Sequence, residues 1–282
     1  MILVTGASGT VGGETARLLA EGGHRARLLL RDPARLPDPR PAAEVVVGDY
    51  DDPEALRAAM SGVRAALIVT ADPSAPRHDA ALVRAARQAG ARRLVKLSAL
   101  AVANPAADDL ITRWQREAEE TVRSSGLEYT LLRPRAFMSN TLGWAEEIRR
   151  TGTVRAWPVD APSACVDPRD VAAVAVRALT EPGHAGCAYP LTGPRALTVR
   201  QQVAVLAHAL GRPLAVEELS EGELRRRLAR RWPEPLADAL AEMAARRLDG
   251  GTARVDPTVE KLLGRPARDY SQWVSEHLSA FR

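Results

Sequence analysis

Short runs of apolar residues alternate with longer amphipathic stretches along the first half of the chain. The apolar runs lie at 2–5, 25–30, 44–47, 65–69, 94–97 and 129–132. Between them, apolar residues recur with helical spacing near 11–21, 53–60, 77–89 and 108–125. Near-continuous apolar strands that alternate with helices are typical of a parallel sheet covered on both faces. Because β-α-β crossovers are right-handed, the pattern predicts a doubly wound, Rossmann-type α/β fold.

The pattern changes after about residue 135. A helix is predicted at 137–149, and a proline-rich stretch follows it. Pro168 is expected to open a further helix, because proline is favoured in a first turn. Residues 198–210 and 220–248 are predicted to be mostly helical. We therefore expect a Rossmann domain over 1–150 and a smaller, mainly helical lobe over 151–282. Part of that lobe, about 164–192, is expected to return to the main sheet through a strand at 187–191.

A glycine-rich loop follows the first apolar run directly. It reads Gly6-Ala7-Ser8-Gly9-Thr10-Val11-Gly12, and a helical pattern comes next. Gly6 permits the tight turn, Gly9 lets the backbone approach a pyrophosphate, and Gly12 lets the helix pack closely on the strand. The N–H groups and partial positive charge of the helix N-terminus would then bind the phosphates. In this strand–loop–helix context the spacing indicates a dinucleotide-binding site. We therefore expect the Rossmann domain over 1–150 to bind NAD(P) and the lobe over 151–282 to bind the substrate.

The residues at the end of the second run indicate which dinucleotide binds. An acid there favours NAD by bonding the ribose 2′-hydroxyl, whereas an arginine accommodates the 2′-phosphate of NADP. Arg31 occupies the position, so NADP(H) is favoured, and the adjacent Asp32 keeps NAD(H) as the alternative. Asp49 is expected either to contact the adenine or to cap the helix that begins at Pro53.

Composition and charge exclude several other classes of protein. The chain has 282 residues, of which 46% are hydrophobic and 26% charged, as in ordinary globular domains. No apolar run is long enough to span a membrane, and the N-terminus lacks the features of a signal peptide. The net charge of +4 is spread along the chain without a nucleic-acid-binding module. The two cysteines and five histidines show no metal-ligand spacing, so no metal is expected and a reducing cytoplasm is favoured.

Several further segments carry a family resemblance. They are TGASGTVG at 5–12, LLLRDPARL at 28–36, GDYDDPEAL at 48–56, VKLSAL at 95–100, SGLEYTLLRP at 125–134, FMSN at 137–140 and VDPRDVAAVAV at 166–176. With these segments the chain resembles the NmrA-like group of atypical short-chain dehydrogenase/reductases over about residues 1–210. The resemblance implies a Rossmann core with a small C-terminal lobe. It leaves the substrate open, because the group includes quinone reductases, other NADPH-dependent reductases and redox sensors without turnover.

The chain departs from the catalytic patterns of its relatives. Short-chain dehydrogenases use Tyr-x-x-x-Lys, but no tyrosine here has a lysine four residues later, and Tyr129 is followed by Arg133. NmrA-like quinone reductases often carry a histidine four residues before a glutamate. Here Gln115 occupies the position of that histidine, and Glu119 follows. A neutral amide is not a general acid, but it donates hydrogen bonds to a substrate oxygen.

The candidate site residues follow from the loop, the strand ends and the resemblance. Ser98 and Gln115 are the candidate catalytic residues, and a strand-end cap is the alternative for Ser98. The expected cofactor-binding residues are Gly6, Ser8, Gly9, Thr10, Val11, Gly12, Arg31, Asp49, Tyr50, Thr70, Ala71, Ser98 and Pro134. The expected substrate-binding residues are Trp114, Phe137, Met138, Asn140 and Trp144, for which ordinary packing is the alternative.

The missing proton donor indicates the kind of substrate. Hydride transfer to an unactivated ketone leaves an alkoxide that needs a positioned acid, whereas a quinone gives a stabilised anion that water protonates. We therefore expect an NADPH-dependent oxidoreductase that reduces a quinone or other electron-poor aromatic carbonyl, with a role in aromatic natural-product biosynthesis as one setting. The alternative is a non-catalytic NAD(P) redox sensor of the NmrA type, acting through a protein partner. We expect a monomer or homodimer that binds neither nucleic acid nor membranes.

Overall fold

The computed structural model describes residues 1–36 and 41–282, which form two compact units. Unit 1 comprises Met1–Ala106, Thr112–Pro134 and Pro168–Pro190. Unit 2 comprises Ala107–Ile111, Arg135–Asp167 and Leu191–Arg282. After Pro134 the chain leaves unit 1 and enters the Arg135–Asp167 segment of unit 2. This crossing comes earlier than the expected domain boundary at residue 150. The chain passes between the units more than once, so neither unit is a single stretch of sequence.

Unit 1 is built on a seven-stranded sheet with the order β3-β2-β1-β4-β5-β6-β8. The strands are β1 Ile2–Thr5, β2 Ala26–Leu30, β3 Glu44–Val47, β4 Ala65–Ile68, β5 Arg93–Leu97, β6 Glu128–Pro134 and β8 Cys187–Leu191. Every pairing among β1 to β6 is parallel. The strand order reverses beside β1, and ligands of such sheets bind outside the carboxyl ends of the strands at this reversal. The predicted doubly wound sheet is confirmed.

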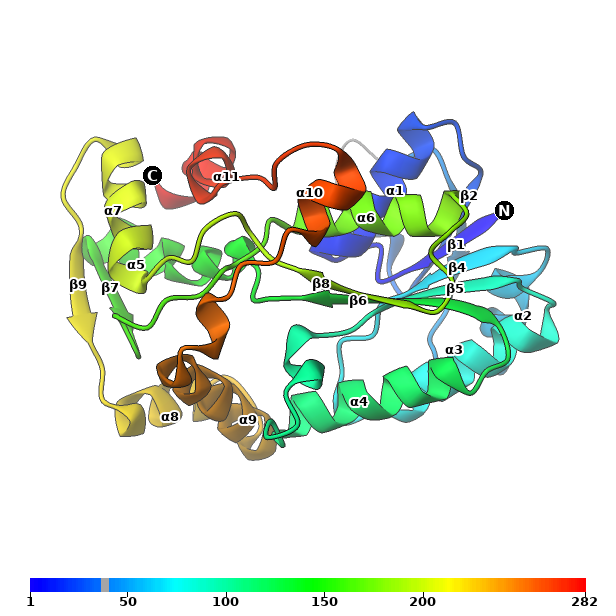
Figure 1. Ribbon diagram of the computed structural model, residues 1–282, viewed down its shortest axis with the longest axis horizontal. Helices are drawn as coiled ribbons and strands as arrows, with labels where there is room; N and C mark the ends of the chain where they lie inside the picture. The colour runs from blue at the N-terminus through cyan, green and yellow to red at the C-terminus, as the bar shows by residue number, and fades with distance from the viewer. Residues whose placement is uncertain (37–40) are drawn as a thin grey trace. The chain divides into compact units, whose positions relative to one another are not determined.

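Helices cover both faces of this sheet (Figure 1). One face carries α1 Thr10–Glu21 and α6 Pro168–Thr180, which pack against each other. The other face carries α2 Pro53–Met60, α3 Arg77–Gln88 and α4 Leu110–Arg123. Leu3, Leu29 and Leu94 of the strands pack there with Leu56, Leu82 and Val122 of these helices. This two-sided burial explains why the central strands are apolar at nearly every position.

Unit 2 contains shorter helices and one small sheet. Its main elements are η3 Met138–Trp144, α5 Ala145–Thr151, β7 Thr153–Ala156, α7 Val199–Leu210, β9 Ala215–Glu218, α8 Glu221–Ala229, α9 Glu234–Ala245, α10 Thr258–Leu263 and α11 Tyr270–His277. The helix predicted at 137–149 is divided into the 3-10 turn η3 and α5. The parallel pair β7 and β9 was not predicted, because each strand has only four residues, part of them polar.

The core of unit 2 forms around aromatic residues of α11. Trp273 and Tyr270 are almost completely buried and stack on each other. Ile148 of α5 and Leu206 of α7 belong to the same cluster. Among the described residues of the chain, no helix is both long and apolar enough to cross a membrane.

Candidate functional site

The glycine-rich loop makes a tight turn between β1 and α1. Gly6 has a φ of +65°, and its carbonyl accepts a 2.9 Å hydrogen bond from the Gly9 N–H. A Cβ at Gly12 would lie 2.3 Å from the Gly6 oxygen, so only glycine fits where the helix meets the turn. Val11, an expected cofactor contact, is buried beneath the loop. The turn therefore depends on the glycines at its two ends.

The N-terminus of α1 is open to a phosphate. Its N-cap is Gly9, which offers no side-chain cap, and the first turn holds no acid. Ser8, Gly9 and Thr10 are all exposed. The first N–H groups of a helix have no partner within the helix and carry partial positive charge. The loop thus leaves uncapped donors at the carboxyl end of β1, which fits the pyrophosphate of a dinucleotide.

Tyr50 fixes the loop against the neighbouring strand. Its hydroxyl accepts a 3.2 Å hydrogen bond from the Gly6 N–H and donates one of 3.2 Å to the Val69 carbonyl. Burial raises the pKa of this hydroxyl, so it stays protonated. The expected cofactor contact Tyr50 therefore has a structural role in positioning the loop. Ala71 is exposed beyond the end of β4, and Pro134 is buried at the end of β6, with β5 between these two strands.

Arg31 and Asp32 differ in how much freedom they have. The Arg31 side chain is 76% exposed, and its Nε lies 3.9 Å from an Asp49 oxygen. The Asp32 carboxylate accepts a hydrogen bond from the Ala34 N–H and caps the short turn η1 Pro33–Arg35. Asp52, and not Asp49, caps α2, so the capping alternative for Asp49 is wrong. The guanidinium is thus the freer group at the end of β2.

A buried ion pair connects β5 with α3. Lys96 is fully buried, and its Nζ lies 3.2 Å from an Asp79 oxygen. Thr70 accepts a hydrogen bond from Lys96 and donates one to Asp79, and the Trp114 indole N–H also donates to Asp79 at 3.1 Å. Burial lowers the pKa of Lys96. Thr70 and Trp114, expected to contact cofactor and substrate, thus use their polar groups in this buried cluster.

The sequence analysis missed the Lys96–Asp79 pair. One signal was available, because Lys96 is one of only two lysines in a chain that otherwise uses arginine for its cations. A lysine retained inside an apolar strand is expensive to bury without a partner, so it predicts a buried carboxylate. The sequence did not indicate that Asp79 of α3 would supply it.

Ser98 lies at the end of β5, and its hydroxyl donates a hydrogen bond to the Glu119 carboxylate. The Oγ–Oε1 distance is 2.6 Å, and both residues are buried. Arg133 of β6 holds the same carboxylate in two hydrogen bonds of 2.8 and 2.5 Å. Burial raises the pKa of Glu119, but the hydrogen bonds from Arg133 and Ser98 outweigh it and the net shift is downward. The hydrogen of the Ser98 hydroxyl is therefore already used in the bond to Glu119, and Ser98 can only accept a hydrogen bond from a ligand.

Gln115 precedes Glu119 by one turn of α4 and is 6% exposed. Its Oε1 is buried without a hydrogen-bond partner in the part of the chain that the structure describes. An unpaired buried amide oxygen is costly, because it has lost its hydrogen bonds to water. The Gln115 amide oxygen is thus a buried hydrogen-bond acceptor of unit 1 that a ligand could satisfy.

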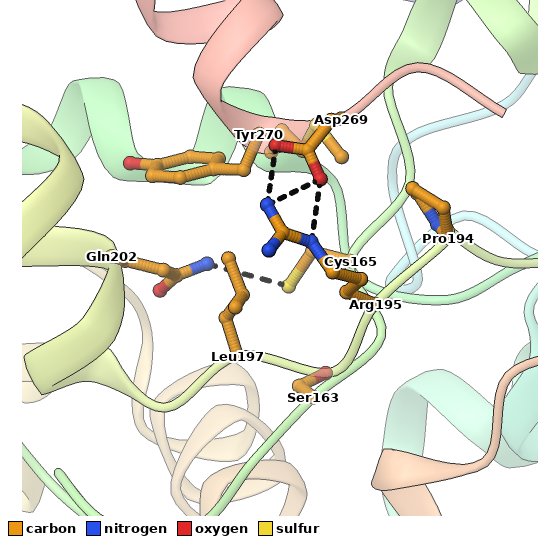
Figure 2. A pocket seen from close by; sticks show the side chains of 9 residues that line it. Ser163, Cys165, Pro194, Arg195, Leu197, Gln202, Asp269 and Tyr270 are labelled. Carbon is orange, nitrogen blue, oxygen red and sulfur yellow. Dashed lines mark hydrogen bonds and ion pairs between the residues drawn. The ribbon is translucent and has the colours of Figure 1, made fainter.

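The other expected substrate residues belong to unit 2. Met138 is buried and lines a small cavity with Ser163, Cys165, Pro194, Arg195, Leu197, Gln202, Asp269 and Tyr270 (Figure 2). At this cavity Asp269 binds Arg195 through two 2.8 Å hydrogen bonds, so the charge of Arg195 is neutralised. Trp144 packs on the unit 2 core, Phe137 pairs with Val166 in an isolated bridge, and Asn140 is exposed.

Within the described ranges, Asp49, Asp51 and His78 bring three metal-ligand atoms within 4.8 Å of one another. Arg77 binds both Asp51 oxygens at 2.7 Å, and these hydrogen bonds together with one from His78 lower the pKa of Asp51. The cluster is thus already neutralised by side chains, and we assign no metal to it.

The chain matches known proteins along its whole length. The family model described as NAD(P)H-binding matches residues 6–182. The chain is 53% identical over 281 residues to a (4-alkanoyl-5-oxo-2,5-dihydrofuran-3-yl)methyl phosphate reductase of Streptomyces griseus, covering 100% of this chain and 99% of that protein. It is 37% identical to an NAD(P)H azoreductase of Xenophilus azovorans, covering 100% of this chain and 99% of that one.

The fold has a close match among solved structures. An NADPH-dependent quinone oxidoreductase of Escherichia coli, solved with NADPH, has a TM-score of 0.84 at 28% identity and covers 98% of this chain and 99% of that one. The expected NAD(P)H chemistry is thus confirmed, and the alternative of a non-catalytic sensor is set aside. The chain belongs to the NAD(P)H-binding family and is an NAD(P)H-dependent reductase.

Proposed function

We propose that this protein uses NADPH to reduce the ring C=C bond of a 4-acyl butenolide that carries a phosphorylated hydroxymethyl group. The observation that carries the proposal is the 53% identity, along the whole chain, to the Streptomyces griseus reductase of such a compound. We place the reaction in the cytoplasm, with the protein acting as a monomer or homodimer on this small molecule. From the sequence we expected an aromatic carbonyl substrate, and we now extend the substrate class to electron-poor conjugated carbonyls that are not aromatic.

The chemistry of this substrate agrees with the missing proton donor. The ring C=C bond is conjugated to both the ring ester and the acyl ketone. When bound, NADPH would supply the hydride, and the ring carbon that bears the phosphorylated side chain would accept it. The electron pair of the broken π bond then spreads over two carbonyl groups as an enolate, which solvent water protonates. Such a stabilised anion needs no strong acid, so a site without Tyr-x-x-x-Lys suffices.

We assign three tasks to residues of unit 1. The N-terminus of α1 binds the pyrophosphate, and Arg31 binds the 2′-phosphate, which favours NADPH over NADH. Ser98, whose proton is directed to Glu119, accepts a hydrogen bond from the nicotinamide amide. Gln115 completes its hydrogen bonding with the bound ligands, which accounts for the unpartnered amide oxygen. The protein thereby positions the reactants, which can contribute several kcal/mol to a bimolecular step.

The test follows NADPH absorbance with three substrates, a phosphorylated acyl butenolide, a quinone and a simple aliphatic ketone. We expect rapid oxidation of NADPH with the butenolide, slower oxidation with the quinone and almost none with the ketone. NADPH doubly deuterated at nicotinamide C4 should place deuterium on the ring carbon that bears the side chain. Deuterium at the acyl carbinol would show ketone reduction instead, and a missing acid would then have to be found.

Quinone reduction is the second candidate function. It is favoured by the full-length structural match to the quinone oxidoreductase, and a quinone likewise gives a stabilised anion. A kcat/KM for quinones above that for the butenolide would make it the principal activity.

A further inference from the structure

Two partly buried arginines of unit 2 form no ion pair with an acid among residues 1–36 and 41–282. Within these ranges Arg135 and Arg247 both have a buried Nε atom that finds no hydrogen-bond acceptor. Among the residues described, each guanidinium has one hydrogen bond, from Arg135 to the Gly251 carbonyl at 3.2 Å and from Arg247 to the Ala161 carbonyl at 2.7 Å. A guanidinium has five N–H donors. Most of their donor capacity is therefore unused by the protein.

The two side chains occupy the same part of unit 2. The loops that accept their hydrogen bonds are joined, because the Ala164 N–H donates to the Thr252 carbonyl and the Thr252 hydroxyl to the Pro162 carbonyl. Burial raises the pKa of the Cys165 thiol, and the positive charges of both arginines oppose that rise. Both guanidinium groups therefore lie near Cys165. The structure thus brings two cations together at one pair of loops.

Neighbouring arginines show that this arrangement is unusual within unit 2. Arg246, the next residue along the chain from Arg247, forms an ion pair with the buried Asp109. Arg195 near the same loop is bound by Asp269. Burial lowers the pKa of Arg135 and Arg247 without a carboxylate to oppose it. Two desolvated cations of like charge are unfavourable together unless an anion joins them.

We infer that Arg135 and Arg247 form a phosphate-binding subsite in unit 2, which takes the phosphomonoester group of the substrate. The identity of that substrate rests on the proposed function. A phosphomonoester carries close to two negative charges and several acceptor oxygens, which matches two guanidinium groups with free N–H donors. Each guanidinium can bind two phosphate oxygens through parallel N–H donors.

The first test measures binding without turnover. Inorganic phosphate is titrated calorimetrically into the protein saturated with NADP⁺, so that the phosphate sites of unit 1 are already occupied. We expect one phosphate site in the wild type, at least tenfold weaker binding in Arg135→Ala and in Arg247→Ala, and a partial recovery in the lysine variants. Arg200→Ala is the control, because this exposed arginine of α7 pairs with Asp160. No phosphate binding to the wild type, or equal affinity in the double variant, overturns the inference.

The second test compares the phosphorylated butenolide with the same butenolide carrying a free hydroxymethyl group. We expect the wild type to prefer the phosphate ester about a hundredfold in kcat/KM, through KM, since each charge-assisted contact contributes about tenfold or more. The double variant should lose this preference, so that its kcat/KM values for the phosphate ester and the alcohol become similar. Equal preference in wild type and double variant contradicts the subsite. If neither compound is reduced, the proposed function fails, and the phosphate titration still decides the subsite.

Discussion

At the scale of single residues, the buried polar groups of unit 1 are suited to position ligands by hydrogen bonding and not to transfer protons. Ser98 directs its proton to Glu119, and Arg133 keeps that glutamate ionised. Gln115 retains an unpartnered amide oxygen. None of these side chains is a protonated acid near neutral pH, which agrees with substrates whose reduced anion is stabilised by conjugation.

Gln115→Ala should therefore lower kcat/KM only modestly. The change removes a neutral hydrogen bond worth about 0.5–1.5 kcal/mol, which corresponds to about a 2- to 12-fold loss. Steady-state NADPH oxidation measures it, with the exposed Glu117→Gln of the same helix as the control. A loss of a thousandfold or more would show that Gln115 takes part in proton transfer.

Arg31→Ala should weaken the binding of NADPH much more than the binding of NADH. A charge-assisted hydrogen bond to the 2′-phosphate is worth about 1.5–3 kcal/mol, or one to two decades in Kd. The exposed neighbour Arg35 provides the matched control Arg35→Ala, for which both cofactors should keep their affinity. Fluorescence titration with each cofactor gives the comparison. Equal losses for NADPH and NADH would remove Arg31 from cofactor recognition.

At the scale of elements, the β1–α1 loop divides its glycines between folding and binding. A Cβ at Gly12 would collide with the Gly6 carbonyl at 2.3 Å, whereas a Cβ at Gly9 would meet only that same oxygen at 3.3 Å. The position before α1 thus tolerates a side chain in the free protein, and the space in front of it is where a pyrophosphate would lie.

Gly9→Val should reduce NADPH affinity strongly with little change in Tm. Gly12→Ala should instead lower the Tm, because the helix must move away from the turn. Gly222→Ala, in α8 of unit 2, is the control and should change neither quantity appreciably. Calorimetric titration and thermal unfolding measure the two effects. Unchanged NADPH affinity in Gly9→Val would mean that the loop does not bind the pyrophosphate.

The Glu119 carboxylate links α4 to the ends of β5 and β6, and this link should depend on pH. Its pKa is lower in the folded protein than in the unfolded chain, so its stabilising effect is present above about pH 4.5 and is lost as the pH falls through the folded-state pKa. Glu119→Gln should be destabilised most near pH 7 and should approach the wild type in acid. Urea unfolding at several pH values measures the difference. A difference that does not change with pH would contradict this prediction.

The sheet was predictable at this scale, whereas the buried contacts were not. The strands β1 to β6 are short and mostly apolar, and helical patterns follow most of them, so the alternation predicts a parallel, doubly wound sheet. The pairing of Lys96 with Asp79, and of Ser98 with Glu119, depends on contacts between distant segments. Such contacts leave no periodic pattern in the sequence, and β7 and β9 are too short and polar to leave one.

At the scale of the whole molecule, unit 1 is completed by a segment far along the chain. Pro168–Pro190 returns to it after the long excursion into unit 2, bringing α6 against α1 and β8 beside β6. The described part of the first 150 residues contains β1 to β6 and the glycine-rich loop but lacks this segment. Without α6, apolar surface of α1 and of one face of the sheet is left exposed to water.

A fragment of residues 1–150 should therefore fail to fold cooperatively. The fragment also carries part of unit 2 without the α7 and α11 residues that complete its core. Circular dichroism with urea unfolding, compared with the full chain, tests this expectation, and the full chain in NADPH provides the stabilised reference. A cooperative transition in the fragment, together with NADPH binding, would show that the segment at 168–190 is dispensable.

The repeated passage of the chain between the two units also limits how new specificities can be made by recombination. Unit 2 consists of three separate pieces of sequence, so it cannot be exchanged between related reductases as one continuous segment. The longest exchangeable piece is Leu191–Arg282, which carries Arg247 but leaves Arg135 behind in the recipient. Chimeras joined at residue 191 would therefore combine one arginine from each parent. Recognition of an acidic substrate should transfer only when the recipient already has arginine at position 135.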